Sequence, residues 1–98
     1  MSKELLIKYI ELLLSHWKLM DDYVRVLGDI SIYRIIDDAY DFIAELIGID
    51  DEVKEFVMNF IDDYLEKGCC NFEHNGEEIS LKTVEDCCDF ILRWKKEF

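Results

Sequence analysis

The sequence predicts a small, mostly α-helical domain, with four helices and a short β-hairpin or structured loop before the last helix. Three observations predict this fold. Apolar residues recur at alternating spacings of three and four, a glycine stands where each of the first three helices should end, and proline is absent. With 51% hydrophobic residues, the 98-residue chain has enough apolar surface for one core, which gives a single acidic helical domain over residues 1–98.

The first helix is expected from about residue 3 to residue 27, before Gly28. Its main apolar stripe comprises Leu6, Ile10, Leu13, Trp17, Met20, Val24 and Leu27. A second apolar row beside it comprises Leu5, Tyr9, Leu12, Leu19 and Tyr23. Because the two rows together form a wide apolar sector, we expect this helix to be the spine on which the other helices pack.

The second helix is expected to begin after a cap at Asp29 or Ser31 and to end at Gly48. Its apolar stripe comprises Ile32, Ile36, Ala39, Ile43 and Leu46. The third helix is expected between a cap at Asp50 and Gly68, with the stripe Val53, Val57, Phe60 and Tyr64. Helices joined by turns this short predict a bundle.

After the third helix the helical spacing of apolar residues is lost. The dipeptide Asn75-Gly76 is the strongest short signal for the tight turn of a β-hairpin. A hairpin with this turn pairs Phe72 with Ile79 and Cys70 with Leu81, which places four apolar groups on one face. Both strands are short, so a structured loop is the alternative.

The last helix is expected to begin after a cap at Ser80 or Thr83. Its apolar stripe comprises Val84, Cys87, Ile91, Trp94 and Phe98. Arg93, Lys95 and Lys96 lie near its end, where positive charge is favoured by the helix dipole.

Charge is distributed unevenly along the chain, whose net charge is -12. Residues 1–28 carry four acids and four bases, residues 29–67 carry twelve acids and three bases, and residues 68–98 carry seven acids and four bases. The middle segment therefore holds -9 of the total. Such a concentration destabilises a fold by self-repulsion, and it exceeds the charge of roughly 2 to 8 that solubility alone requires.

The acids of the second and third helices are therefore the candidate binding residues. They comprise Asp37, Asp38, Asp41, Glu45, Asp51, Glu52, Glu55, Asp62 and Asp63, with Tyr33 or Tyr40 as an aromatic anchor. We expect them to bind a basic protein surface, in particular that of a nucleic-acid-handling protein. Direct binding to nucleic acid or to an anionic membrane is excluded by like charge. The alternative is a solvated face without a partner.

Catalytic and metal-binding motifs are not recognisable in the sequence. The two histidines, His16 and His74, accompany no nucleophile motif, so we expect neither an enzyme nor a cofactor. Neighbouring acids such as Asp37 and Asp38 should project about 100° apart on a helix. The adjacent cysteines of the pairs 69–70 and 87–88 likewise point in different directions, which disfavours a zinc site. Cys87 is expected to be a small buried hydrophobic residue.

These features together predict a non-catalytic acidic inhibitor that blocks a nucleic-acid-binding surface. The same physical type includes phage anti-restriction and anti-CRISPR inhibitors, although no residue motif links the chain to them. One alternative is an immunity protein that neutralises a nuclease toxin. An alternative of another class is an adaptor or oligomerisation module that uses the apolar face of the first helix. We expect a cytoplasmic monomer or homodimer with free thiols.

Overall fold

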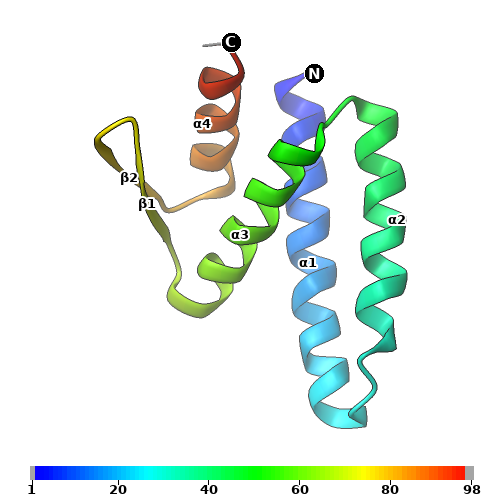
Figure 1. Ribbon diagram of the computed structural model, residues 1–98. Helices are drawn as coiled ribbons and strands as arrows, with labels where there is room; N and C mark the ends of the chain where they lie inside the picture. Colours follow the sequence, from blue (N-terminus) through cyan, green and yellow to red (C-terminus); the bar gives the residue numbers. More distant parts are fainter. Residues whose placement is uncertain (1, 97–98) are drawn as a thin grey trace.

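The computed structural model describes residues 2–96, which form four α-helices and one β-hairpin (Figure 1). The elements in chain order are α1 (Lys3–Leu27), α2 (Ser31–Ile47), α3 (Asp51–Lys67), β1 (Cys70–His74), β2 (Glu77–Leu81) and α4 (Val84–Lys96). The predicted four-helix fold with a hairpin before the last helix is therefore confirmed. Phe98, predicted for the last stripe, lies outside the described residues.

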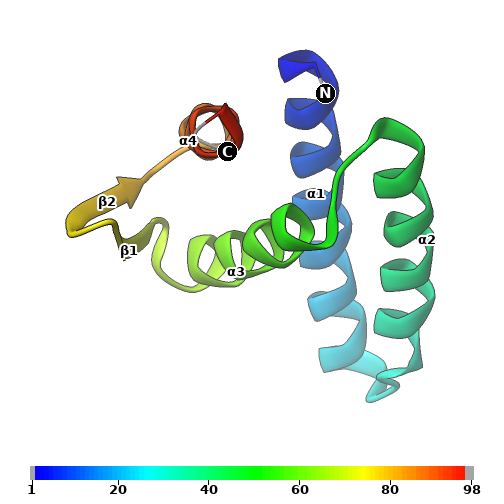
Figure 2. The same cartoon turned by 45° about the horizontal axis from the view of Figure 1, so that its top comes forward.

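The helix α1 is the spine of the fold, because it contacts α2, α3 and α4. The helices α1 and α2 form an antiparallel pair, and α3 crosses in front of α1 (Figure 1). The helix α4 packs beside the first half of α1, so the far end of the α1–α2 pair projects beyond α3 and α4 (Figures 1 and 2). The resulting molecule measures 43 × 30 × 19 Å.

Three of the helices have a side-chain N-cap. A short polar residue before an amphipathic run predicts such a cap. The Asp50 carboxylate accepts a hydrogen bond of 2.9 Å from the backbone N–H of Val53, and the Thr83 hydroxyl accepts one of 3.0 Å from that of Asp86. The hydroxyl of Ser2 caps α1 in the same way. The predicted caps at Asp50 and Thr83 are confirmed.

The start of α2 differs from the prediction. Its N-cap residue is Ile30, which makes no side-chain capping bond and has nearly helical backbone angles. Asp29 instead bonds to Ser31, accepting from both its backbone N–H at 2.9 Å and its hydroxyl at 2.7 Å. The carboxylate therefore closes a turn before the helix, so the prediction of a cap at Asp29 or Ser31 is wrong by one residue.

The hairpin forms in the predicted register. Cys70 pairs with Leu81 and Phe72 with Ile79 in an antiparallel sheet of two strands. At the turn, Asn75 and Gly76 both have positive φ, 52° and 79°. This is the conformation that a two-residue turn requires between strands with a right-handed twist, and asparagine and glycine adopt it most readily.

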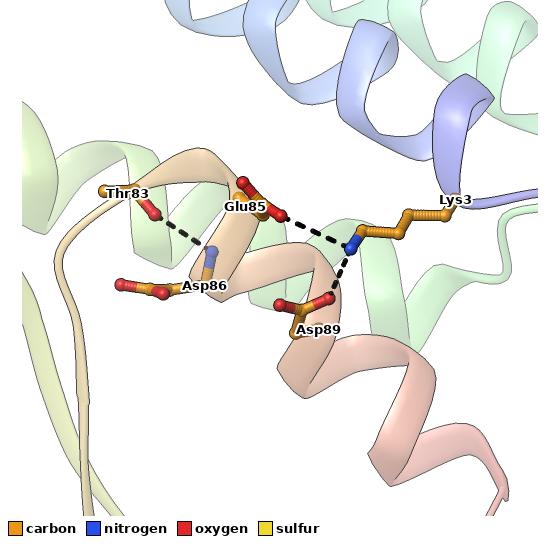
Figure 3. A network of polar contacts seen from close by, with 5 residues as sticks. All are labelled: Lys3, Thr83, Glu85, Asp86 and Asp89. Carbon is orange, nitrogen blue, oxygen red and sulfur yellow. Dashed lines mark hydrogen bonds and ion pairs between the residues drawn. The ribbon is translucent and has the colours of Figure 1, made fainter.

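An aromatic cluster attaches the hairpin to α3 and α4. The ring of Phe90 packs against those of Phe56 and Phe72, with centroids 5.2 and 5.0 Å apart, and the ring of Trp94 extends the cluster. A two-stranded hairpin is marginal by itself in water, so this packing stabilises it. At the other side of α4, Lys3 Nζ contacts Asp89 at 2.9 Å and Glu85 at 3.5 Å, which joins α4 to the start of α1 (Figure 3).

The buried face of α1 agrees with the predicted main stripe only over the first three-quarters of the helix. Leu6, Ile10, Leu13 and Met20 are buried, whereas Trp17 and Val24 are half-buried and Leu27 is 59% exposed. Tyr9, predicted for the second row, also belongs to the core. Leu27 lies beyond the reach of α3 and α4, so placing it in the core was wrong.

The predicted stripe of α2 needs a larger correction. Tyr40 and Ala44 are its buried residues, while Leu46 is 70% exposed and Ile43 and Ala39 are exposed as well. The reason is that α2 packs mainly against one neighbour, α1, which covers only part of its apolar circumference. The helix is rotated so that the ring of Tyr40 meets the rings of Tyr9 and His16.

Candidate protein-binding surface

The outer side of α3 carries two groups of three carboxylates, separated by six residues without an acid. The helix buries Val53, Val57 and Phe60, and its acids occupy the positions between them. Six carboxylates lie within residues 51–66, which at ~1.5 Å of rise per residue is about one per 4 Å. A single DNA strand carries one phosphate per about 3.4 Å, so the mean charge density along this row is similar, although the spacing is uneven. The row comprises Asp51, Glu52, Glu55, Asp62, Asp63 and Glu66.

A second acidic row lies on α2 and comprises Asp37, Asp38, Asp41 and Glu45. Carboxylate oxygens of Asp37, Asp38 and Asp41 all lie within 4.8 Å of one another. This corrects the expectation that Asp37 and Asp38 point apart, because rotation about the side-chain bonds brings both carboxylates over the same turn as Asp41. We call the rows of α2 and α3 together the acidic surface.

The two rows meet where the second half of α2 lies beside the start of α3. Lys54 Nζ contacts Asp41 at 2.6 Å and Asp51 at 3.7 Å. The hydrogen bond from Lys54 to Asp41 raises the pKa of this lysine, with further contributions from the charges of Asp41, Asp51 and Asp37. A hollow beside the pair is lined by Asp38, Asp41, Phe42, Ala44, Glu45, Ile49, Asp51 and Lys54. Lys54 therefore already supplies one positive charge to this part of the surface.

A second lysine neutralises the start of α3 from the opposite side. Lys95 Nζ of α4 contacts Asp50 and Glu52, each at 3.0 Å. The backbone N–H of Val53 and then Lys95 lower the pKa of Asp50. Three of the nine predicted acids, Asp41, Asp51 and Glu52, are thus paired within the chain. Those without an ion pair among residues 2–96 comprise Asp37, Asp38, Glu45, Glu55, Asp62 and Asp63.

The acids at the other end of α3 make no ion pair among residues 2–96. Partial burial raises the pKa of Asp62, and the nearby charges of Asp21, Asp63 and Glu66 raise it further. Asp63 accepts a weak hydrogen bond of 3.5 Å from the thiol of Cys70. The like charges of Asp21, Asp63 and Glu66 thus disfavour the ionised form of Asp62 beyond the effect of its burial.

Neither tyrosine predicted as an anchor presents a free ring. The hydroxyl of Tyr33 donates a hydrogen bond of 2.5 Å to Asp21, and its ring packs against Trp17. Tyr40 is only 5% exposed, and its hydroxyl is hydrogen-bonded to His16 Nδ1. Tyr40 therefore does not fit the anchor role predicted for it. Phe42, which is 62% exposed at the edge of the acidic surface, is the aromatic ring that sequence reasoning missed.

The four cysteines are free thiols, and three of them are buried. Burial raises the pKa of Cys70 to about 11 and that of Cys88 to about 12. Burial also raises the pKa of Cys87, which is fully buried in the core as predicted. Among the described residues, the Asp37, Asp38 and Asp41 group is the one set of three or more potential metal ligands that converge, and no cysteine belongs to it.

A second surface, apolar in character, includes the apolar face of the first helix that the adaptor alternative named, and its extension onto α2 was not predicted from the sequence. Eleven large hydrophobic side chains of the described residues are exposed, and all of them lie between residues 5 and 46. The signal was the wide apolar sector of the first two helices, which exceeds what one packing partner can cover. The set comprises Leu5, Leu12, Leu19, Tyr23, Val26, Leu27, Ile30, Ile35, Phe42, Ile43 and Leu46.

Comparisons with protein-family models, with curated protein sequences and with solved structures gave no match for this chain. None of the helices described within residues 2–96 combines the length and the apolar character needed to cross a bilayer. The helix α1 is long enough at 25 residues, but charged side chains interrupt it from Lys3 onwards.

Proposed function

We propose that this protein is a non-catalytic inhibitor that binds a basic, nucleic-acid-binding surface of another protein through its acidic surface. The observation that carries the proposal is that residues 29–67 hold -9 of the net charge, and that the acidic rows of α2 and α3 meet at Lys54, which contacts Asp41 and Asp51. Six carboxylates there make no ion pair among residues 2–96, although the chain contains eleven lysines and arginines. Such a field repels nucleic acid and attracts its binding proteins.

The mean charge density of α3 supports competition with nucleic acid in particular. With about one carboxylate per 4 Å, α3 offers a basic groove a charge density similar to that of one DNA strand. Long-range attraction of this kind also accelerates association and weakens as salt is added. The four free thiols agree with the reducing cytosol, in which we place the interaction.

The proposal is tested by reversing charges that are free of intramolecular pairing. The variant Asp37→Lys, Asp38→Lys, Glu45→Lys reverses three of the four acids of the α2 row but leaves the Lys54 contacts in place. A matched control, Glu73→Lys, Glu77→Lys, Glu78→Lys, changes the net charge equally on the hairpin, where all three acids are exposed. Each protein is immobilised and incubated with a cell lysate, and the bound proteins are eluted with salt rising from about 0.05 to 0.5 M.

The expected result is that the wild type and the hairpin control retain the same basic nucleic-acid-binding proteins. The α2 variant should lose them, and added duplex DNA should displace them from the wild type. Retention by all three proteins alike, or a partner that DNA does not displace, would contradict the proposal.

A further inference from the structure

The exposed side chains of α1 form a straight apolar row beside α2. Leu5, Leu12, Leu19 and Val26 recur every seven residues and are 49%, 52%, 65% and 81% exposed. Seven residues are close to two helical turns, so the four side chains follow one line along the helix. The row lies next to Tyr9 and His16, four residues on from Leu5 and Leu12, which contact Tyr40 of α2. Lys3, which reaches α4, lies on the opposite flank of α1.

The apolar flank of α2 lies on the same side of the helix pair. Asp41 lies on the flank of α2 that faces Lys54 of α3. The buried side chains of Tyr40 and Ala44 lie between this acidic flank and the apolar flank of the same helix. The apolar flank therefore lies largely on the side of α2 away from Lys54, with Phe42 at its edge, where this ring also lines the hollow beside Asp51 and Lys54. It comprises Ile35, Phe42, Ile43 and Leu46. We call the four α1 residues and these four residues the apolar face.

The size of the apolar face is that of a protein interface. Eight large side chains that are 37–81% exposed present on the order of 1,000 Å² of surface. The largest apolar patch on a typical monomer is about 300–600 Å², and a standard interface buries about 800 Å² on each partner. The face is thus larger than a monomer usually leaves in water and is large enough for a stable dimer.

The charges along α1 fit a second copy of α1 in the antiparallel direction. If Leu12 lies opposite Leu19 of the second copy, then Leu5 lies opposite its Val26. In this register Lys8 comes within one residue of the position opposite Asp22 of the second copy. Two further charged pairs on the same edge of α1 come within about two residues of each other across the two copies. They are Glu4 with Arg25 and Glu11 with Lys18.

The parallel direction does not share this complementarity. It would set Lys8 beside Lys8 and Glu11 beside Glu11 of the second copy. Within one chain, Asp22 and Arg25 make only a long, exposed contact of 3.9 Å, so both remain able to pair across an interface. The edge of α1 is therefore self-complementary about a twofold axis near Ser15 and His16.

We propose that the protein is a homodimer in which the apolar faces of two copies pack together, with α1 antiparallel to α1 of the second copy. Apart from Phe42 at their shared edge, the acidic surface lies outside this contact, so this inference is independent of the function proposed above. Each copy contributes a net charge of -12, and this mutual repulsion opposes dimerisation. Added salt screens the repulsion, so the dimer persists or tightens as salt rises.

The experiment measures mass by light scattering and the dissociation constant by sedimentation equilibrium, at about 0.05 and 0.5 M salt. The variant Leu12→Glu, Leu19→Glu should weaken the dimer at least about 100-fold, because it places four uncompensated carboxylates inside the interface. Both side chains are more than half exposed in the single chain. The circular dichroism spectrum should therefore stay that of the folded wild type, which separates loss of the interface from loss of the fold.

Charge swaps test the register independently. Lys8→Glu alone and Asp22→Lys alone should each weaken the dimer about tenfold, and the two changes together should restore it. Lys82→Glu, an exposed lysine outside the face, is the matched control for the charge change. Single swaps that act no more strongly than Lys82→Glu, or a double variant without recovery, would overturn the antiparallel arrangement.

A wild type that stays monomeric at high protein concentration would overturn the dimer itself. So would a dimer that the Leu12 and Leu19 changes leave intact. Binding of the monomer to neutral lipid vesicles, abolished by the same two changes, would assign the apolar face to a lipid surface instead.

Discussion

The two halves of this molecule differ in how far they bury their large apolar side chains. From residue 51 to residue 96, every large hydrophobic side chain is buried or half-buried, and the rings of Phe56, Phe72, Phe90 and Trp94 pack together. From residue 5 to residue 46, eleven large hydrophobic side chains are exposed. The difference teaches that α3, the hairpin and α4 cover their large apolar side chains within the chain, whereas the α1–α2 pair leaves an exposed apolar surface of the kind that is typical of a binding site.

The comparison predicts a large difference between two phenylalanines. Phe90 is 4% exposed and contacts rings from α3, the hairpin and α4, so Phe90→Ala should lower the free energy of unfolding by about 3–5 kcal/mol. Phe42 on α2 is 62% exposed, so Phe42→Ala should change the stability of the monomer by less than about 0.5 kcal/mol. Urea unfolding at low protein concentration measures both, and equal losses would contradict the comparison.

The free energy of unfolding should fall at alkaline pH, because the buried thiols of the core then ionise. The pKa of Cys70 is raised by burial to about 11 and that of Cys88 to about 12, from 9.0. A raised pKa means that the folded protein favours the neutral thiols, so their contribution is complete below pH 9 and is lost as pH rises through 11 and 12. The urea midpoint should therefore be level up to about pH 9 and fall above it. Cys88→Ala should reduce this fall, and an unchanged slope would count against thiol ionisation.

A smaller effect is expected at the start of α3. Asp50→Ala removes both the cap on Val53 and a contact with Lys95, which should cost about 1–2 kcal/mol. Asp29→Ala, at the start of α2, should cost less, because the hydrogen bonds of Asp29 within residues 2–96 go to the exposed Ser31. Thermal unfolding of both variants at neutral pH provides the measurement. A larger loss of stability in Asp29→Ala than in Asp50→Ala would contradict this assignment of the caps.

Unfolding at acid pH provides a second test of the role of the Asp50 carboxylate. Hydrogen bonding to Val53 and the contact with Lys95 lower the pKa of Asp50, so its contribution is present above its ordinary pKa of 3.8. That contribution is lost as pH falls through the lowered value. In Asp50→Ala the decline of stability below about pH 4 should be shallower than in the wild type. Parallel acid-unfolding curves for the two proteins would contradict this assignment.

The sequence predicted those features that local chemistry determines. Asn75 and Gly76 specify their own turn, and the turn fixes the pairing of Phe72 with Ile79. Asp50 and Thr83 cap the helices that follow them for an equally local reason. The positions of the acids on the outer side of α3 also followed from helical spacing, because its apolar stripe is narrow and fixes the rotation of the helix.

The sequence could not predict which part of a wide apolar sector becomes buried. On α2 the apolar residues span two possible core faces, and the choice depends on where α1 lies in space. The Tyr40 ring packs on Tyr9, and this contact between distant residues leaves Leu46 in solvent. The pairing of Lys54 with Asp41 is likewise a tertiary contact, so helical spacing alone overestimated the free charge of the acidic surface.

The central claim is that the acidic surface and the apolar face are separate binding surfaces. The most direct test measures dimerisation and partner binding in one salt titration. Mass by light scattering reports the dimer, and retention of the captured partner reports the acidic surface, from about 0.05 to 0.5 M salt. We predict that the partner dissociates while the dimer persists. Loss of both together, or a partner that remains bound at the highest salt, would contradict the account.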